Sequence, residues 1–268
     1  MKFAKFTLAR RVVLLVILGL FFLQLFRSKI LIGGLTGSLI LHWVNLLDLF
    51  AFLESALSSR SFQLEAFYSA LPVLIFYLIM GRAFCGWVCP LDLVFRGVDR
   101  MKQSSKNLPA WTRGALLAPA GFLIFAALAQ IPFFTSHVSP ITNFYRSISA
   151  TFFWAGGLPG EISVLSISIL ILAGFLLLEF LWPRLWCKNL CPVGKTYGLF
   201  NRLSFLHVEI SAGECRGCQK CQEACYMGVK ILPGNGRTKI RDSSCIICGR
   251  CVEACSTQGK ILEMRFGR

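Results

Sequence analysis

The feature that most constrains this chain is the spacing of its last eight cysteines, which form two runs with the same pattern, Cys-x2-Cys-x2-Cys-x3-Cys. In this pattern three closely spaced cysteines hold one [4Fe–4S] cubane, and the fourth reaches over to the other cubane. We therefore expect two cubanes and single-electron transfer. The first cluster is assigned to Cys215, Cys218, Cys221 and Cys255, and the second to Cys245, Cys248, Cys251 and Cys225.

Disulfides and structural zinc are the alternatives for the same cysteines. Zinc sites use two Cys-x2-Cys pairs separated by a longer loop, and they need no third and fourth cysteine in each run. One departure from the usual cluster motif concerns the residue after the fourth cysteine, which is Tyr226 in the first run and Ser256 in the second instead of proline. The ligands are intact, but the shielding of each cluster, and with it the reduction potential, can differ.

The composition predicts an α-helical membrane protein with a soluble tail. Hydrophobic residues make up 55% of the 268 residues and charged residues 15%, and the mean hydropathy is +0.64, which is too apolar for an ordinary soluble domain. Four transmembrane helices are expected, roughly at residues 12–26, 66–80, 115–131 and 162–181. Arg27 and Lys29 follow the first segment where a signal peptide would have a small-residue cleavage site, so we expect an uncleaved span.

Residues 30–53 are also apolar, but glycines interrupt them and polar residues punctuate them. We expect an interfacial or re-entrant segment there, with an extra span as the alternative. The predicted organisation is thus a four-helix transmembrane domain over residues 1–207, followed by an α+β two-cluster ferredoxin-type domain over residues 208–268.

The distribution of Lys and Arg predicts the orientation. Fourteen of these residues flank the predicted spans on the side of the two termini, and four lie on the other side. The positive-inside rule then places both termini in the cytoplasm of a bacterial inner membrane, where thiols stay reduced and clusters can be assembled. The formal net charge of +15 is mostly this bias, so it predicts contact with anionic lipid rather than with nucleic acid.

The other four cysteines belong to an internal repeat. At an offset of 102 residues, residues 82–90 align with residues 184–192, and each copy contains Cys-x3-Cys-Pro where a predicted span reaches the cytoplasmic side. The four cysteines are Cys85, Cys89, Cys187 and Cys191. Cysteines four apart on a helical turn present both sulfurs on one side, which suits two ligands of one metal centre. Three interpretations remain open: a third cluster or other metal site, redox-active thiols, and packing of small residues.

With its predicted four spans, its two Cys-x3-Cys-Pro motifs and its two C-terminal runs, the chain resembles the NapH/MauN family of membrane ferredoxin-type proteins. The resemblance implies a quinol-dehydrogenase subunit that passes electrons from the quinone pool toward periplasmic nitrate reductase, beside a periplasmic iron–sulfur or cytochrome partner. It maps the family's cluster ligands onto the eight cysteines from Cys215 to Cys255. Other relatives serve amine-dehydrogenase maturation, nitrous oxide reduction and copper insertion, so a maturation factor that supplies electrons or metal is the alternative.

The sequence contains no Cys-x-x-Cys-His haem motif, no dinucleotide fingerprint and no Walker P-loop. The electrons must therefore come from a partner protein or from a lipid-soluble donor such as quinol. Polar residues in or near the apolar segments are candidates for a quinone or proton path, although most are expected to be interfacial, and Glu179 has Arg184 as an expected partner. These candidates are His42, Asp48, Glu54, Glu65, His137, Glu161 and Glu179.

Overall fold

The computed structural model describes residues 5–23, 31–34, 36–40, 44–101, 117–155, 162–211, 215, 217–231, 237–255 and 261–267. The chain divides into two compact units. The tail unit contains Met1–Val16, Ile75–Cys89 and Gly194–Arg268, and the helical unit contains Ile17–Leu74 and Pro90–Val193. The domain boundary predicted at residue 208 lies close to the first strand of the tail, but the tail unit also includes segments from the first 207 residues.

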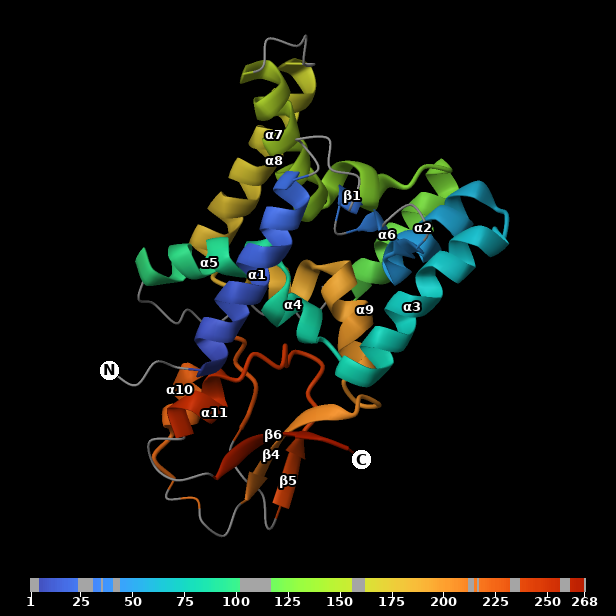
Figure 1. Ribbon diagram of the computed structural model, residues 1–268. Coiled ribbons are helices and arrows are strands. Elements are labelled where there is room, and N and C mark those ends of the chain that lie inside the picture. The colour runs from blue at the N-terminus through green and yellow to red at the C-terminus, as the bar shows by residue number, and fades with distance from the viewer. Residues whose placement is uncertain are drawn as a thin grey trace. The chain divides into compact units, whose positions relative to one another are not determined.

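The tail unit is built around a three-stranded antiparallel sheet in the order β5-β4-β6 (Figure 1). Its elements are β4 (Leu206–Ser211), α10 (Lys220–Ala224), β5 (Arg237–Ile240), α11 (Arg250–Cys255) and β6 (Leu262–Phe266). The two short helices pack against each other, and α11 packs on β6. The core consists of Val208, Ile210, Ile231, Val252, Ile261 and Leu262. This α+β arrangement is the one expected for the tail.

Four helices contribute further segments to the tail unit: α1 (Lys5–Leu23), α3 (Leu64–Met80), α4 (Ala83–Trp87) and α9 (Pro192–Phe200). The parts of α1 and α3 that belong to it are the start of α1 and the end of α3. The rings of Tyr77 on α3 and Tyr197 on α9 are stacked, with their centroids 3.3 Å apart. Both side chains are almost fully buried, so this pair joins the end of α3 to α9.

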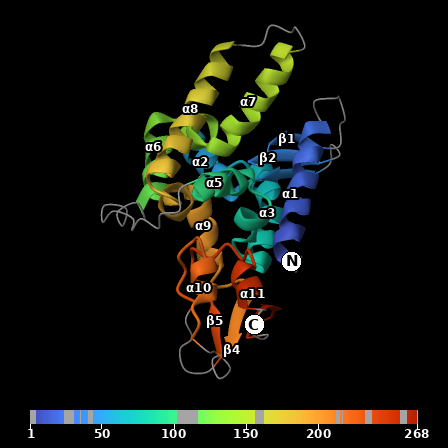
Figure 2. The ribbon, with the colours of Figure 1, turned by 90° about the vertical axis from the view of Figure 1, so that its left-hand side faces the viewer.

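The helical unit contains the end of α1, the first part of α3 and a small antiparallel meander of β1 (Leu31–Gly34), β2 (Gly37–Ile40) and β3 (Val44–Leu47). It continues with α2 (Leu49–Ser59), α5 (Pro90–Met101), α6 (Ala118–Ala129), α7 (Pro140–Ala155) and α8 (Ile162–Leu181). Two short π-helical turns complete it, η3 (Phe134–Val138) and η4 (Trp186–Leu190). Helices α7 and α8 lie side by side along their length (Figures 1 and 2).

The meander and α2 lie in the segment predicted to be interfacial or re-entrant at residues 30–53, and that membrane position stays a prediction. Gly33 has a φ of +113°, a backbone conformation that favours glycine. Asp48 then starts α2, because its carboxylate accepts hydrogen bonds from the N–H groups of Phe50 (3.2 Å) and Ala51 (3.3 Å). The glycines and the acidic cap therefore divide an apolar stretch into short elements.

Two helices among the described residues, α1 and α8, are long and apolar enough to cross a membrane by length and composition. The bounds of α8 coincide with the predicted span at residues 162–181, and α1 covers most of the first predicted span. The helices at the second and third predicted spans are shorter, with 17 residues in α3 and 12 in α6. Helix α6 ends where Gln130 adopts a left-handed conformation, two residues before Pro132.

Candidate iron–sulfur site

The loops of the two cysteine runs have the same backbone form. In the first run Gly217 and Gln219 flank the second cysteine with φ values of +67° and +58°. In the second run Ile247 and Gly249 occupy the equivalent positions with φ values of +49° and +75°. A left-handed conformation is rare for a β-branched residue such as Ile247, so this loop is held in a strained form. The duplication seen in the sequence is therefore also a duplication of loop geometry.

The four cysteines assigned to the second cluster line one apolar cavity. They are Cys225, Cys245, Cys248 and Cys251, and the same cavity is lined by Val208, Ile231 and Ile240. Burial is the main cause that raises the pKa of the Cys245 thiol to about 12, and its neighbours Cys248 and Cys225 add to this rise. Cys225 comes from the first run, so the structure brings it to the cavity of the second run, as the crossed ligand pattern requires.

The other three cysteines assigned to the first cluster all lie near Cys255. Burial raises the pKa of Cys221, and the nearby thiols of Cys255 and Cys215 raise it further. Burial likewise raises the pKa of Cys255, with smaller contributions from Cys215 and Cys218. Cys218 is the exposed member of this set, whereas Cys215, Cys221 and Cys255 pack against the apolar core. Each set offers four sulfurs, which is the donor chemistry of a cubane.

The two Cys-x3-Cys-Pro motifs have one wide backbone hydrogen bond in common. The N–H of Cys89 donates to the carbonyl of Phe84 (3.2 Å), and the N–H of Cys191 donates to the carbonyl of Trp186 (2.8 Å). Both bonds span five residues, but the first motif also has the ordinary helical bond from the N–H of Val88 to the carbonyl of Phe84 (2.9 Å), so only the second motif is a π-helical turn. Cys85 and Cys89 belong to the tail unit, and the other pair belongs to the helical unit. Within the described ranges no three His, Cys, Asp or Glu side chains surround a site for a single metal ion.

Two arginines make reciprocal contacts between the copies of this repeat. Arg184 precedes the second motif and forms an ion pair of 3.0 Å with Asp92, which follows the first motif. Arg82 precedes the first motif, and its guanidinium occupies the space that a side chain at Gly194, after the second motif, would fill. Asp92 and Gly194 are equivalent at the offset of 102 residues. Each copy thus receives the arginine of the other copy.

Two of the polar candidates are buried carboxylates that accept hydrogen bonds from backbone N–H groups. Glu54 is fully buried and accepts hydrogen bonds from the N–H groups of Phe134 (2.6 Å) and Thr135 (2.9 Å). Glu179 accepts from the N–H of Arg184 (2.6 Å), so the pairing expected from the sequence is present.

The remaining polar candidates do not gather at one place that the structure describes. Asp48 caps α2, Glu65 is exposed in the first turn of α3, and the ring of His137 stacks near Phe133. His42 and Glu161 lie outside the described residues, as does Ser256.

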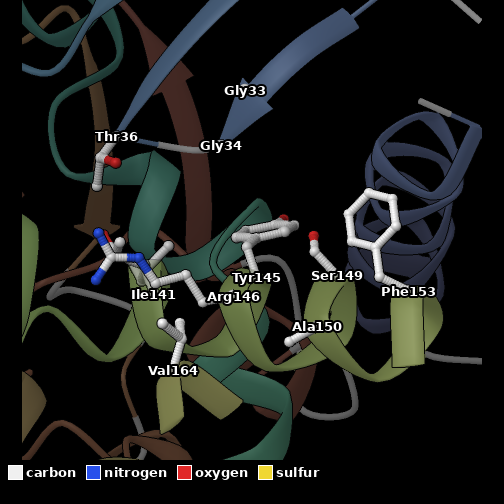
Figure 3. A pocket seen from close by; sticks show the side chains of 11 residues that line it. Gly33, Gly34, Thr36, Ile141, Tyr145, Arg146, Ser149, Ala150, Phe153 and Val164 are labelled. Carbon is white, nitrogen blue, oxygen red and sulfur yellow. The ribbon is translucent and has the colours of Figure 1, made fainter. Parts of the chain in front are cut away.

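A cavity of about 400 Å³ that sequence reasoning missed lies between β1 and α7 (Figure 3). Tyr145, Ser149 and Phe153 project toward it from one face of α7, and the backbone of Gly33 and Gly34 closes the opposite side. Its volume falls in the range of about 300–1,000 Å³ that is usual for small-molecule sites. In the sequence these three residues recur every four positions, as side chains on one face of a helix do, and this spacing could have indicated a shared lining. None of the three is charged, so the spacing did not stand out as a functional pattern.

Comparison with known proteins supports the same site. A family described as "4Fe-4S dicluster domain" matches residues 207–256, and one described as "4Fe-4S binding domain" matches twice, at residues 64–108 and 165–208. The methylamine utilization ferredoxin-type protein MauN of Paracoccus denitrificans (strain Pd 1222) is 31% identical over 223 residues, covering 80% of this chain and 74% of that protein. The chain belongs to the NapH/MauN family of ferredoxin-type proteins.

Other members of the NapH/MauN family show similar coverage. MauN of Methylorubrum extorquens is 30% identical, covering 78% of this chain and 71% of that protein. The ferredoxin-type protein NapH of Escherichia coli (strain K12) is 27% identical, covering 81% of this chain and 73% of that protein. No solved structure matches the chain. The resemblance predicted from the motifs is confirmed, and this NapH/MauN member is an iron–sulfur electron-transfer protein.

Proposed function

We propose that this chain is a membrane-bound subunit of a quinol dehydrogenase, which passes electrons from the quinone pool toward a periplasmic reductase such as nitrate reductase. Its acceptor would be a periplasmic iron–sulfur or cytochrome protein. The observation that carries the proposal is the convergence of Cys225, Cys245, Cys248 and Cys251 on one apolar cavity. Two bound cubanes would supply one-electron storage, and the chain would hold them and shield them from water.

The proposed topology has four spans with both termini in the cytoplasm of the bacterial inner membrane. It is supported by α1 and α8, whose apolar windows are only 17% and 11% buried within the protein, as lipid-facing helices would be. The shorter helices α3 and α6 would complete the set, with flanking Lys and Arg side chains reaching the interface. The basic side would then face the anionic lipids of the cytoplasmic leaflet.

We assign the quinol headgroup to the cavity between β1 and α7. Its lining is mainly apolar, and the hydroxyl group of Ser149 projects toward it from α7, where it could orient a polar ring (Figure 3). The aromatic ring of Phe153 adds a surface against which a flat headgroup can pack.

Protein purified without oxygen should contain at least eight iron atoms, and a quinol analogue should reduce its clusters. Ser149→Phe should fill the cavity and slow quinol-driven reduction by about tenfold or more, because the headgroup loses its space. Reduction would be followed by EPR on freeze-quenched samples, with dithionite as a second reductant.

The matched control is Thr151→Phe, since Thr151 lies on α7 and is exposed. It should leave reduction by quinol unchanged, and both variants should be reduced normally by dithionite. Zinc without iron in the purified protein would refute the cluster assignment. Full quinol activity in Ser149→Phe would refute the cavity assignment alone.

A third centre held by Cys85, Cys89, Cys187 and Cys191 is a separate proposal. It is supported by the internal repeat and by the reciprocal arginine contacts. If these cysteines share a cluster, the iron content should be near twelve, and replacing Cys89 and Cys191 together with Ala should lower it by about four. A pair of redox thiols would instead keep the iron and lose a disulfide that alkylation after oxidation detects. Iron near eight in both proteins, with normal electron transfer, would leave only packing.

A maturation factor for an amine dehydrogenase, nitrous oxide reductase or copper oxidase is the second candidate function. The observation in its favour is the identity of 31% to MauN, against 27% to NapH of Escherichia coli. The two functions differ in what a strain without this chain accumulates. An electron-transfer subunit would leave a fully assembled reductase that lacks its electrons, whereas a maturation factor would leave an oxidoreductase without its cofactor.

A further inference from the structure

Arg10, in the first part of α1, contacts the walls of the second-run cavity. Its side chain is buried, with 2% of its surface exposed. Its Nε donates to the carbonyl of Gly86 (2.6 Å), and its two terminal nitrogens donate to the carbonyl of Cys248 and to the hydroxyl of Tyr226 (3.4 Å each). One guanidinium therefore joins the first Cys-x3-Cys-Pro motif to a cluster ligand, Cys248, and to the residue that follows another ligand, Cys225.

The first Cys-x3-Cys-Pro motif itself packs on the loop of the second run. The indole N–H of Trp87 donates to the carbonyl of Ile247 (2.9 Å). Gly86 approaches so closely that an added Cβ would lie 2.5 Å from the carbonyl oxygen of Ile246. Ile246 and Ile247 are 4% and 3% exposed. The loop of the second run is thus enclosed by protein, whereas residues 217–220 of the first run are exposed.

Tyr226 is the residue that stands in place of the usual proline, and it contributes to this arrangement. Its hydroxyl accepts from Arg10, and the guanidinium of Arg250 lies over its ring, 4.8 Å from the centroid. Asp242 is a nearby acidic group, because its charge contributes to the raised pKa of Cys245. Two arginines and one aspartate are therefore charged groups close to this cavity.

We propose that Arg10 is a positioning residue that raises the reduction potential of the centre held by Cys225, Cys245, Cys248 and Cys251. Reduction adds negative charge, and a fixed positive charge at a buried position stabilises the reduced state more strongly than an exposed charge does. Hydrogen bonding and burial around a cluster are known determinants of its potential. The electron would then rest at the enclosed centre beside the first motif rather than at the exposed one. This inference rests on the proposed cluster ligands.

The test is an EPR-monitored redox titration of purified Arg10→Gln and Arg10→Lys in detergent. In Arg10→Gln that carries one electron, the ratio of reduced second-run cluster to reduced first-run cluster should fall about tenfold. This corresponds to a reduction potential of the second-run cluster that is lower by ~59 mV. Arg10→Lys keeps the charge and should retain most of the potential. A Cys218→Ser background changes the signal of the first-run cluster and so identifies which cluster has shifted. Arg265→Gln, at an ion-paired and half-exposed site on β6, is the charge control and should shift neither.

Each other outcome contradicts a stated claim. A wild-type protein without iron would refute the proposed function, whereas two normal clusters with unchanged potentials in Arg10→Gln would refute this inference alone. Loss of four irons in Arg10→Gln but not in Arg10→Lys would make the role structural and would also refute it. If Arg10→Gln does not fold, Arg10→Met also removes the charge and keeps an unbranched side chain that suits a buried position. It should lower the potential of the same cluster to the same extent, and the absence of any shift would count against the proposal.

Discussion

Replacing Cys225 with Ala should remove the cluster of the second run, although Cys225 itself lies in the first run. The reason is geometric, because Cys225 lines the same cavity as Cys245, Cys248 and Cys251. A cubane that loses one of its four thiolate ligands in a buried site is expected to be lost as a whole. The iron content should therefore fall by about four atoms per chain, and the EPR signal that remains should be that of the first-run cluster.

The matched variant is Cys221→Ala, four residues earlier in the same run. It should remove the other cluster, because the neighbours of Cys221 are Cys255 and Cys215. Cys255→Ala should then give the same spectrum as Cys221→Ala, although Cys255 belongs to the second run. If Cys225→Ala and Cys221→Ala instead gave the same remaining signal, each run would hold its own cluster and the crossed assignment would be wrong.

The cysteine runs were predictable because cluster chemistry determines their local spacing. Three ligands within seven residues must wrap one face of a cubane, so the sequence alone implies tight loops. The structure adds the left-handed residues that make these turns, including Ile247, whose side chain gives no hint of a φ of +49°. The apolar stretch that forms α8 is also a local feature of the sequence, and the bounds predicted for it are those of the helix in the structure.

Features that depend on distant contacts were not predictable from the sequence. The partners of Arg10 lie 76 and 238 residues away along the chain, and among the basic residues near the start of the chain nothing marks it out. The cavity beside α7 depends on glycine backbone about 110 residues before Tyr145. The contacts of the polar candidates also depend on segments that the sequence alone does not bring together. A buried carboxylate in an apolar segment is consistent with a functional site, but it equally suits a helix end that needs an acceptor.

Glu54→Gln should destabilise the helical unit by about 3 kcal/mol, because it replaces a buried carboxylate that accepts hydrogen bonds at the start of a helical turn. The carboxylate of Glu54 on α2 accepts from the N–H groups of Phe134 and Thr135, and from the hydroxyl of Thr135, at the start of η3. Glutamine has almost the same shape but only one acceptor oxygen, so its NH₂ group would face a donor at a site that water does not reach. Unfolding by heat or denaturant in detergent, followed by tryptophan fluorescence, would measure the loss.

The same substitution at Glu65 is the control, since Glu65 is exposed in the first turn of α3. Glu65→Gln should change the free energy of unfolding by no more than about 0.5 kcal/mol. Thr135→Ala removes only the hydroxyl donor, so its effect should lie between the two. If Glu54→Gln were as mild as Glu65→Gln while the iron content stayed normal but quinol-driven reduction failed, Glu54 would act in the quinol path instead. The role assigned to it in joining α2 to η3 would then be wrong.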